Sequence, residues 1–458
     1  MIPDAWRSGE AAVLGLGRTG IAAARFLVGE GFQVYASDFS DSDKNAEALA
    51  ELRSRGVHID LGSHDLDRIA NATLVVTSPG IPPTAPPLVV AQSAGRTIVA
   101  ELDLALLALQ EIPSILVTGT NGKSTTTALI AHILNEAGSS AVAAGNIGYP
   151  LIEISQESAR PEWLVVEASS YQLHFSSFHT PRIGVLTNLS PDHLEWHGSV
   201  EAYREAKKRL FLNASSTSEW ILNGDDEAVL ELAEEVPGVR RCWSLETKSD
   251  SWFDSANETL QLGGEILLQR QQLLLLGDHN VSNALAAVAV ARHLGMKGAE
   301  IREALASFKG VNRRFTKVGE VAGVTIIDDY GHHPVEIAAV LRAARQACEG
   351  RVIAVHQPHR YTRLHSLFDD FCACFNDADV VGIADVYAAG EEPIPGASRD
   401  DLVAGLVRHG HRHALAVESE DDLEQLVRAE TKPGDMVVCL GAGTISQWAN
   451  NLPERLKG

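Results

Sequence analysis

The chain has 458 residues, of which 45% are hydrophobic and 21% are charged, and its formal net charge at pH 7 is -22. This length exceeds what one hydrophobic core serves, so about three domains are expected, and the composition excludes a disordered protein. The acidic balance argues against nucleic-acid binding, because no basic stripe is present to neutralise phosphates.

The first predicted domain, residues 1–97, opens with a short apolar strand and a glycine-rich turn. Gly15, Gly17 and Gly20 form the pattern G-x-G-x-x-G, and a helix pattern and a second strand ending at Asp38 follow. Such a βαβ unit brings the turn close to a diphosphate. The pattern favours a diphosphate ligand other than NAD(P). NAD(P) itself, or close helix–strand packing with no ligand, are the alternatives.

The second predicted domain, residues 98–310, begins with ILVTGTNGKSTTT, a strand that runs into a turn and then a helix. Gly119 and Gly122 allow backbone N–H groups to approach an anion. Lys123 supplies a charge for the β- and γ-phosphates, and the Ser124 hydroxyl is placed to bind Mg²⁺. The segment therefore predicts a site for ATP or GTP. The alternative is a glycine turn that only caps a helix.

Later strands of the same domain also end in polar loops, in the segments GNIG, EASSYQL and NLSPDHLEWHG. Ligands bind beyond the carboxyl ends of parallel strands, so these loops should converge on the phosphate loop. Glu167 and His193 are then candidate metal ligands, and surface or core roles are the alternatives. Tyr203 and Lys207 share a helix face, but by itself Lys207 reads as a solvated lysine. Asn280 is placed to cap a later helix.

The third predicted domain, residues 311–458, again alternates strands with helices, which predicts an α/β unit. His332 and His333 suggest either a metal site or a turn, because a proline follows them at a predicted helix start. Arg360 and Arg363 are three residues apart and suit a clamp for a carboxylate or phosphate, with solvated arginines as the alternative.

Taken together, these motifs resemble the Mur ligases, the ATP-dependent amino-acid ligases of peptidoglycan precursor synthesis. TGTNGKSTTT, GNIG, EASSYQL, NLSPDHLEWHG, YREAK and GDHNVSNALAA, with GLGRTG and SPG near the start, are similar to the glutamate-adding member. The C-terminal motifs IDDYGHHPVEI, HQPHRYTR, DVYAAGEEPIPG and GAGTI are similar to the alanine-adding member. The family implies an α/β chain with a Rossmann-like N-terminal domain, a central P-loop ATPase-like domain with a parallel sheet, and a Rossmann-like C-terminal domain.

The resemblance also implies a role for each motif residue. The catalytic residues would be Lys123, His193 and Lys207, the last as a carbamylated lysine. Residues implied to bind ATP are Gly119, Thr120, Asn121, Gly122, Lys123, Ser124, Thr125, Asn280, Asn283, Arg314 and Asp329. Residues implied to bind the UDP-sugar are Gly15, Leu16, Gly17, Arg18, Thr19, Asp38, Ser78, Gly80 and Asn146. The implied amino-acid site holds His332, His333, Arg360 and Arg363, and the implied Mg²⁺ ligands are Ser124, Glu167, His193 and Lys207.

These roles imply that ATP activates a carboxylate and that an amide then forms, with D-glutamate added to UDP-N-acetylmuramoyl-L-alanine. The alternatives are addition of L-glutamate to the same acceptor, or of L-alanine to UDP-N-acetylmuramate, since the C-terminal motifs differ. A UDP-sugar sensor without catalysis, or an NAD-dependent oxidoreductase, explains fewer of the motifs. No apolar run reaches the roughly 20 residues of a membrane span, so we expect a cytoplasmic protein that binds no membrane. We further expect a monomer that uses ATP and Mg²⁺ and binds no nucleic acid.

Overall fold

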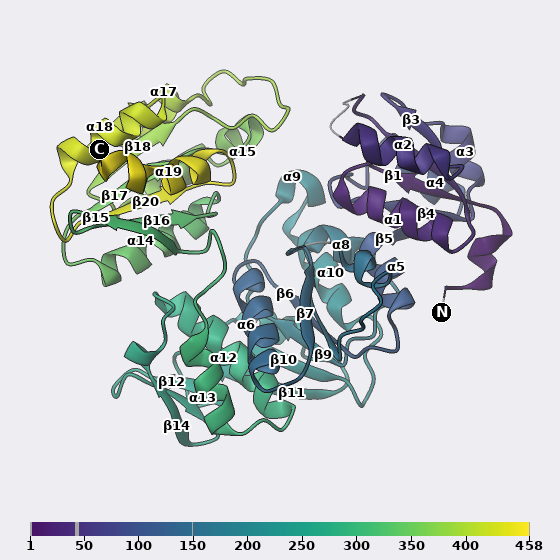
Figure 1. Ribbon diagram of the computed structural model, residues 1–458, viewed down its shortest axis with the longest axis horizontal. Helices are drawn as coiled ribbons and strands as arrows, with labels where there is room; N and C mark the ends of the chain where they lie inside the picture. The colour runs from purple at the N-terminus through teal and green to yellow at the C-terminus, as the bar shows by residue number, and fades with distance from the viewer. Residues whose placement is uncertain (1, 42–44, 149, 458) are drawn as a thin grey trace. The chain divides into compact units, whose positions relative to one another are not determined.

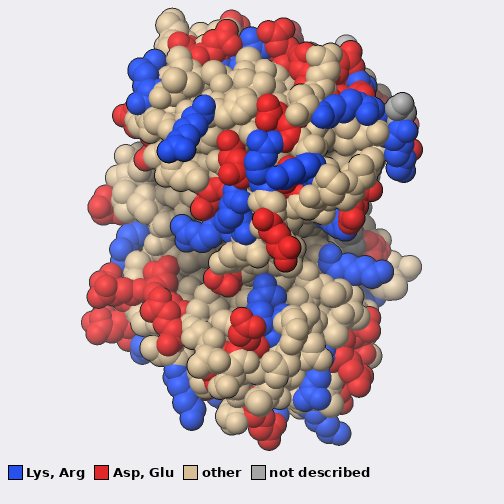
Figure 2. Space-filling model, turned by 90° about the vertical axis from the view of Figure 1, so that its left-hand side faces the viewer, with Lys and Arg blue, Asp and Glu red and all other residues tan. Residues whose placement is uncertain are grey.

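Residues 2–41, 45–148 and 150–457 are described by the computed structural model, and over these ranges the chain forms three α/β domains (Figure 1). By compactness the chain divides into two units, residues 1–270 with 282–305, and residues 271–281 with 306–458. Among the described residues, every helix is too short or too polar to cross a membrane. Lysines and arginines are interspersed with acidic side chains over the face drawn in Figure 2.

The N-terminal domain is a parallel sheet with strand order β3-β2-β1-β4-β5. Its strands are β1 (Glu10–Leu14), β2 (Gln33–Asp38), β3 (His58–Leu61), β4 (Leu74–Thr77) and β5 (Thr97–Ala100). Its helices are η1 (Asp4–Ser8), α1 (Arg18–Gly29), α2 (Ala46–Ser54), α3 (Leu66–Asn71) and α4 (Pro86–Ser93), and α5 (Glu101–Ala108) follows β5. Successive β1 residues alternate between faces, so Val13 packs with α1 and Leu14 with α3 and α4. Helices therefore cover both faces, as the Rossmann-like prediction requires.

The central sheet has the strand order β14-β13-β12-β11-β10-β9-β6-β8-β7 and is parallel from β12 to β7. Its strands are β6 (Ser114–Thr118), β7 (Ala141–Gly145), β8 (Trp163–Glu167), β9 (Ile183–Leu186), β10 (Glu219–Asn223), β11 (Val239–Ser244), β12 (Ser251–Asp254), β13 (Thr259–Leu262) and β14 (Glu265–Gln269). Its helices are α6 (Lys123–Glu136), α7 (Leu151–Ile154), α8 (Ser170–His174), α9 (Leu194–His197), α10 (Val200–Lys208), η3 (Arg209–Phe211), α11 (Glu227–Leu232), η4 (Arg270–Gln272), α12 (Asp278–His293) and α13 (Gly298–Ser307). Because β9, β6, β8 and β7 are parallel neighbours, their polar loops lie at one edge, as predicted.

The C-terminal sheet has the order β15-β16-β20-β17-β18-β19, with β15 antiparallel at one edge. Its strands are β15 (Thr316–Val321), β16 (Val324–Asp329), β17 (Val352–His356), β18 (Val380–Ala384), β19 (Ala414–Val417) and β20 (Met436–Leu440). Its helices are α14 (Pro334–Ala347), α15 (Tyr361–Ser366), α16 (Phe368–Ala373), α17 (Arg399–Arg408), α18 (Glu420–Glu430) and α19 (Ile445–Lys457). Helices α14, α16 and α17 pack on one face and α18 and α19 on the other.

Candidate active site

The phosphate loop connects β6 to α6, and the helix begins at Lys123. Its shape depends on two glycines in backbone conformations that other residues rarely adopt, Gly119 with φ 145° and Gly122 with φ 82°. A Cβ at Gly119 would lie 1.9 Å from Thr187 Oγ1, and one at Gly122 would lie 2.2 Å from Asn283 Oδ1. Both positions therefore strongly favour glycine, which lets the backbone approach a phosphate closely.

The tip of this loop is held by the residues that follow β9. The backbone N–H of Asn121 donates to Asn188 Oδ1 over 2.7 Å, and Asn188 Nδ2 donates to the Asn121 carbonyl over 3.0 Å. Thr187 Oγ1 donates to the same carbonyl over 2.6 Å. Lys123 Nζ donates to the Thr120 carbonyl over 2.6 Å. These hydrogen bonds order the loop before a nucleotide binds, which favours a preorganised phosphate site. Ser124 and Thr125 lie in the first turn of α6.

Lys207 is buried beneath the phosphate loop, so the interpretation of this residue as a solvated lysine is wrong. Only 1% of its surface is exposed, as for Tyr203 one turn earlier in α10. Lys207 Nζ donates to Thr118 Oγ1 over 3.0 Å and to the Gly119 carbonyl over 2.7 Å. Burial, and secondly the charge of Lys123, hold the pKa of this amine well below its usual range. The site therefore favours an uncharged, nucleophilic amine.

Glu167, the last residue of β8, offers an oxygen that suits a cation. The side chain is buried, and its Oε1 accepts from Asn146 Nδ2 over 2.8 Å. Its Oε2 is buried and has no hydrogen-bond partner in the described part of the chain. An unpaired buried carboxylate oxygen costs several kcal/mol, about 1–3 for the lost hydrogen bond alone, and a bound cation removes that cost. Glu167 therefore fits Mg²⁺, whose preferred ligands are oxygens.

His193 precedes α9 in the left-handed conformation, with φ 54°, and its ring centre is 4.7 Å from that of Tyr171. Among the described residues, no group of three or more His, Cys, Asp or Glu is close enough together to hold a metal ion alone. The residues Ser124, Glu167, His193 and Lys207 remain a predicted set, and the unsatisfied Oε2 of Glu167 supports one member of it.

In the N-terminal domain, the predicted diphosphate turn is held by Asp38 from the next strand. Asp38 Oδ2 accepts from the Leu16 N–H over 2.6 Å, and Ser78 Oγ donates to the Gly15 carbonyl over 3.1 Å. A Cβ at Gly20 would lie 1.8 Å from the Gly15 oxygen, so this glycine is required by packing. Asp38 therefore shapes the turn itself, which a ribose contact alone would not require.

The open side of this turn is formed by other predicted residues. A Cβ at Gly17 or at Gly80 would meet no described atom within 4 Å, so space remains beside both. Arg18 Nη1 donates to the Gly148 carbonyl over 2.8 Å, which connects the turn to the loop after β7. Thr19 is half-buried in the first turn of α1. The arrangement leaves room for a diphosphate beside the turn.

Three residues predicted to bind the nucleotide belong to the second compact unit, Asn280, Arg314 and Asp329. Asn280 and Arg314 line a cavity of about 330 Å³ in this unit. Asn280 lies within the first turn of α12, which begins at Asp278, so it does not stand at the cap position that was predicted for it. Its Nδ2 donates to the Leu276 carbonyl over 2.8 Å. Asp329 accepts from the N–H groups of Phe315 and Gly331 over 2.6 Å each, and burial raises its pKa to about 6. Asp329 thus holds two loops together.

The predicted amino-acid residues are already engaged within the C-terminal domain. His333 caps α14, which agrees with a turn, and the His332 ring lies 3.0 Å from the Tyr330 carbonyl. Arg360 Nη1 lies 3.6 Å from a carboxylate oxygen of Glu391. Arg363 Nη1 donates to the carbonyl of the residue four positions earlier over 3.2 Å. These contacts leave a clamp by the two arginines as a prediction.

Comparisons with known proteins match the whole chain. Three family models match in succession, "Mur ligase MurD-like, N-terminal domain" over residues 9–100, "Mur ligase middle domain" over 117–291 and "Mur ligase, glutamate ligase domain" over 313–443. The UDP-N-acetylmuramate–L-alanine ligase of Ruegeria pomeroyi is 50% identical over 458 residues, covering 97% of this chain and 96% of that protein. The chain belongs to the Mur ligase family.

Further comparisons agree. The UDP-N-acetylmuramate–L-alanine ligase of Paracoccus denitrificans is 48% identical to this Mur ligase, covering 96% of the chain and 95% of that protein. The crystal structure of a UDP-N-acetylmuramate–alanine ligase from Thermotoga maritima matches with a TM-score of 0.65 at 25% identity, covering 98% of this chain and 99% of that one. The prediction of three α/β domains and of an ATP-dependent ligase of peptidoglycan synthesis is thereby confirmed.

The prediction that this Mur ligase adds D-glutamate to UDP-N-acetylmuramoyl-L-alanine is wrong. The assignment of the enzyme as a UDP-N-acetylmuramoyl-L-alanine–D-glutamate ligase is therefore wrong as well. Relatives of about half identity over the full length are named for L-alanine and UDP-N-acetylmuramate. The motifs behind the glutamate assignment surround the phosphate loop and the diphosphate turn. They therefore lie at the predicted nucleotide and diphosphate sites, and the identity of the amino acid requires other residues.

Two site residues were missed from the sequence, Thr118 and Thr187. Thr118 is the last residue of β6 and contacts Lys207, and Thr187 follows β9 and contacts the tip of the phosphate loop. Both lie at the carboxyl ends of adjacent central strands. That position, combined with a hydroxyl group, is the signal that identifies them.

Proposed function

We propose that this Mur ligase joins L-alanine to UDP-N-acetylmuramate with hydrolysis of ATP to ADP and phosphate. The observation that carries the proposal is the identity of about half, over the full length, to relatives named for this reaction. The phosphate loop above a buried Lys207 and beside Glu167 supports an intact catalytic centre.

In this mechanism the acceptor carboxylate attacks the γ-phosphorus of ATP, the bond to the β-phosphate oxygen breaks, and an acyl phosphate and ADP form. Lys123 and the loop N–H groups stabilise the charge that develops on the γ-phosphate oxygens. The alanine amine then attacks the acyl carbon, loses a proton, and phosphate leaves as the amide forms. Mg²⁺, when bound, neutralises phosphate charge, and Ser124, Glu167 and His193 would hold it.

Lys207 is proposed to carry a carbamate. Its uncharged amine attacks the carbon of CO₂, an N–C bond forms as one C–O π bond opens onto oxygen, and one proton passes to solvent, which leaves an anion in place of the neutral amine. The lowered pKa and full burial support this step, because an ammonium group has no lone pair to react. An anion at this position compensates the charges of Lys123 and of a bound cation.

The remaining roles are proposals on the same basis. The adenine nucleotide is assigned to the phosphate loop with Asn280, Asn283, Arg314 and Asp329, and the UDP-sugar to Gly15, Leu16, Gly17, Arg18, Thr19, Asp38, Ser78, Gly80 and Asn146. The single carboxylate of L-alanine needs one cation, for which Arg360 and Arg363 are candidates, with His332 and His333 beside them. The cytoplasmic location and the monomeric state stay predictions.

The test is a phosphate-release assay with ATP, Mg²⁺, UDP-N-acetylmuramate and L-alanine, followed by mass spectrometry of the product. We expect phosphate release that depends on all four components, and a product heavier than the acceptor by one alanine residue. Phosphate release that ignores L-alanine, or a product lacking alanine, contradicts the proposal.

A further inference from the structure

The first compact unit contains a cationic cavity whose described lining includes no residue of the phosphate loop. It has a volume of about 290 Å³ and is lined by Gln92 and Arg96 from the N-terminal domain and by His174, Ser177 and Arg209 from the central domain, beside apolar residues. No aspartate or glutamate is among its described lining residues. This is notable in a chain whose net charge is -22, because acids are abundant elsewhere.

Arg96 brings an unsatisfied donor to this cavity. Its Nε is buried and has no hydrogen-bond partner among the described residues. Arg96 lies between α4 and β5, so its backbone is fixed on both sides. A buried guanidinium N–H without an acceptor costs free energy, and a bound oxyanion supplies the missing acceptor.

Arg209 contributes a second guanidinium whose charge is not paired by a lining acid. Its Nε donates to the carbonyls of Leu173 and Ser176 over 2.9 Å each, and its Nη2 donates to Ser177 Oγ over 2.8 Å. The acid that acts on it is Asp103, whose carboxylate already accepts from the Ser177 and Phe178 N–H groups. Burial lowers the pKa of Arg209 despite this acid. Among the described residues, no acid that lines the cavity therefore balances its guanidinium charges.

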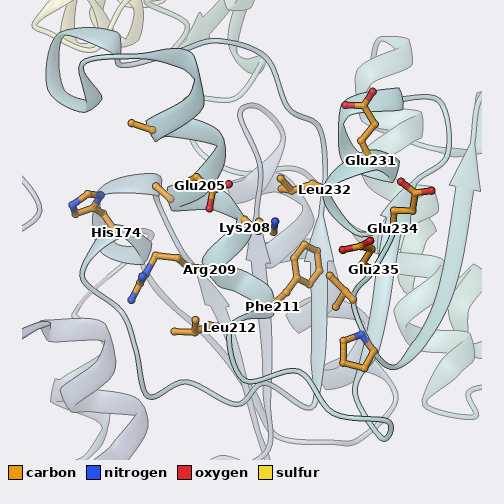
Figure 3. Close-up of a pocket in the computed structure, with 14 residues that line it drawn as sticks. His174, Glu205, Lys208, Arg209, Phe211, Leu212, Glu231, Leu232, Glu234 and Glu235 are labelled. Atoms are coloured by element: carbon orange, nitrogen blue, oxygen red, sulfur yellow. The ribbon is translucent and has the colours of Figure 1, made fainter.

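A larger neighbouring pocket of about 870 Å³ shares His174 and Arg209 with this cavity. Figure 3 shows that these two residues lie at one end of the larger pocket, while Glu231, Glu234 and Glu235 lie at the opposite end. The guanidinium of Arg209 points away from those glutamates. Glu205 also lines the larger pocket, but neither Glu205 nor the three glutamates at the opposite end line the smaller cavity.

We propose that the cavity between Arg96 and Arg209 binds a phosphate group, a site distinct from the ATP and UDP-sugar sites. Two guanidinium groups without a lining acid match the charge of about -2 on a phosphate near neutral pH, and their planar donors suit its oxygens. Gln92, Ser177 and the His174 ring supply further polar contacts. Because residues of both domains line the cavity, a bound phosphate joins the N-terminal and central domains.

The test is isothermal titration of the full-length protein with inorganic phosphate, with Mg²⁺ and a non-hydrolysable ATP analogue present to fill the phosphate loop. We expect saturable binding that weakens at least about tenfold in Arg96→Gln, since one charge-assisted contact is lost. Gln92→Glu places a carboxylate in the cavity at an exposed position and should weaken binding similarly. Arg53→Gln changes an exposed arginine on α2 outside the cavity and should leave binding unchanged.

Other anions separate the ligand classes. Sulfate should compete with phosphate, and acetate should compete much less. Tighter binding of glucose 6-phosphate than of phosphate would identify a small phosphorylated metabolite as the occupant, and the reverse would identify free phosphate. Absence of binding to the native protein, binding by Arg96→Gln and Gln92→Glu as tight as that of the native protein, or competition by acetate as strong as that by sulfate overturns the proposal. None of these outcomes depends on the ligase reaction.

Discussion

Replacement of Lys207 by alanine tests the proposed carbamate. The native side chain is fully buried and its amine makes two hydrogen bonds to the start of the phosphate loop. Removing the buried stem should cost about 2–5 kcal/mol of stability, as for other large-to-small core changes. Removing the anion should lower kcat by about 10²–10³-fold, as for loss of one preorganised electrostatic group. Lys208→Ala, at the exposed neighbouring position, is the matched control and should retain activity.

The assay is phosphate release by Lys207→Ala with and without a short carboxylic acid such as acetate, after thermal unfolding has shown that the variant is folded. Partial recovery with the acid is expected, because the cavity left by the side chain can hold a small carboxylate. Carbon-13 NMR of the native enzyme in labelled bicarbonate gives an independent readout that requires no variant, and a carbamate resonance that disappears in Lys207→Ala is expected. Near-normal turnover without rescue, or no carbamate resonance, refutes the reasoning.

Glu167→Gln removes the charge on the unsatisfied Oε2, so the Mg²⁺ concentration for half-maximal activity should rise at least about tenfold. An unchanged magnesium dependence would remove Glu167 from the metal site. Gly122→Ala forces a Cβ against Asn283 Oδ1 and leaves the backbone of residue 122 strained. The variant should lose binding of a fluorescent ATP analogue and about 1–3 kcal/mol of stability. Normal binding would show that the loop tolerates a side chain. Burial raises the pKa of Glu101 from 4.5 to about 7. The stability that follows from this raised pKa is fully present below pH 4.5 and is lost as the pH rises from 4.5 through 7, a loss of about 3 kcal/mol. Glu101→Gln should flatten the urea-unfolding stability between these pH values, and an unaltered slope would assign the pH dependence to another group.

The fold and the position of the phosphate loop could be predicted because their signals are local. The glycines of the turn, the β-rich run before Lys123 and the polar loops after later strands each stand in a few consecutive residues. The burial of Lys207 could not be read in the same way, since it depends on packing of α10 beneath a loop almost ninety residues earlier in the chain. The contact of Asp38 with the Leu16 N–H likewise arises only when β1 and β2 pair.

The amino acid was assigned wrongly for a related reason. The motifs behind that assignment lie at the predicted phosphate loop and at the predicted diphosphate turn, and the residues that select the amino acid lie elsewhere. The antiparallel strands β13, β14 and β15 were also not predicted, because their pairing lies outside the strand–helix alternation that guided the prediction.

The proposed activity is tested most directly by a competition assay. The enzyme is supplied with ATP, Mg²⁺, equal amounts of UDP-N-acetylmuramate and UDP-N-acetylmuramoyl-L-alanine, and equal amounts of L-alanine, L-glutamate and D-glutamate, and the products are resolved by mass spectrometry. The account predicts one product, UDP-N-acetylmuramoyl-L-alanine formed by consumption of UDP-N-acetylmuramate and L-alanine. Consumption of UDP-N-acetylmuramoyl-L-alanine with incorporation of glutamate, while UDP-N-acetylmuramate stays unchanged, would contradict it.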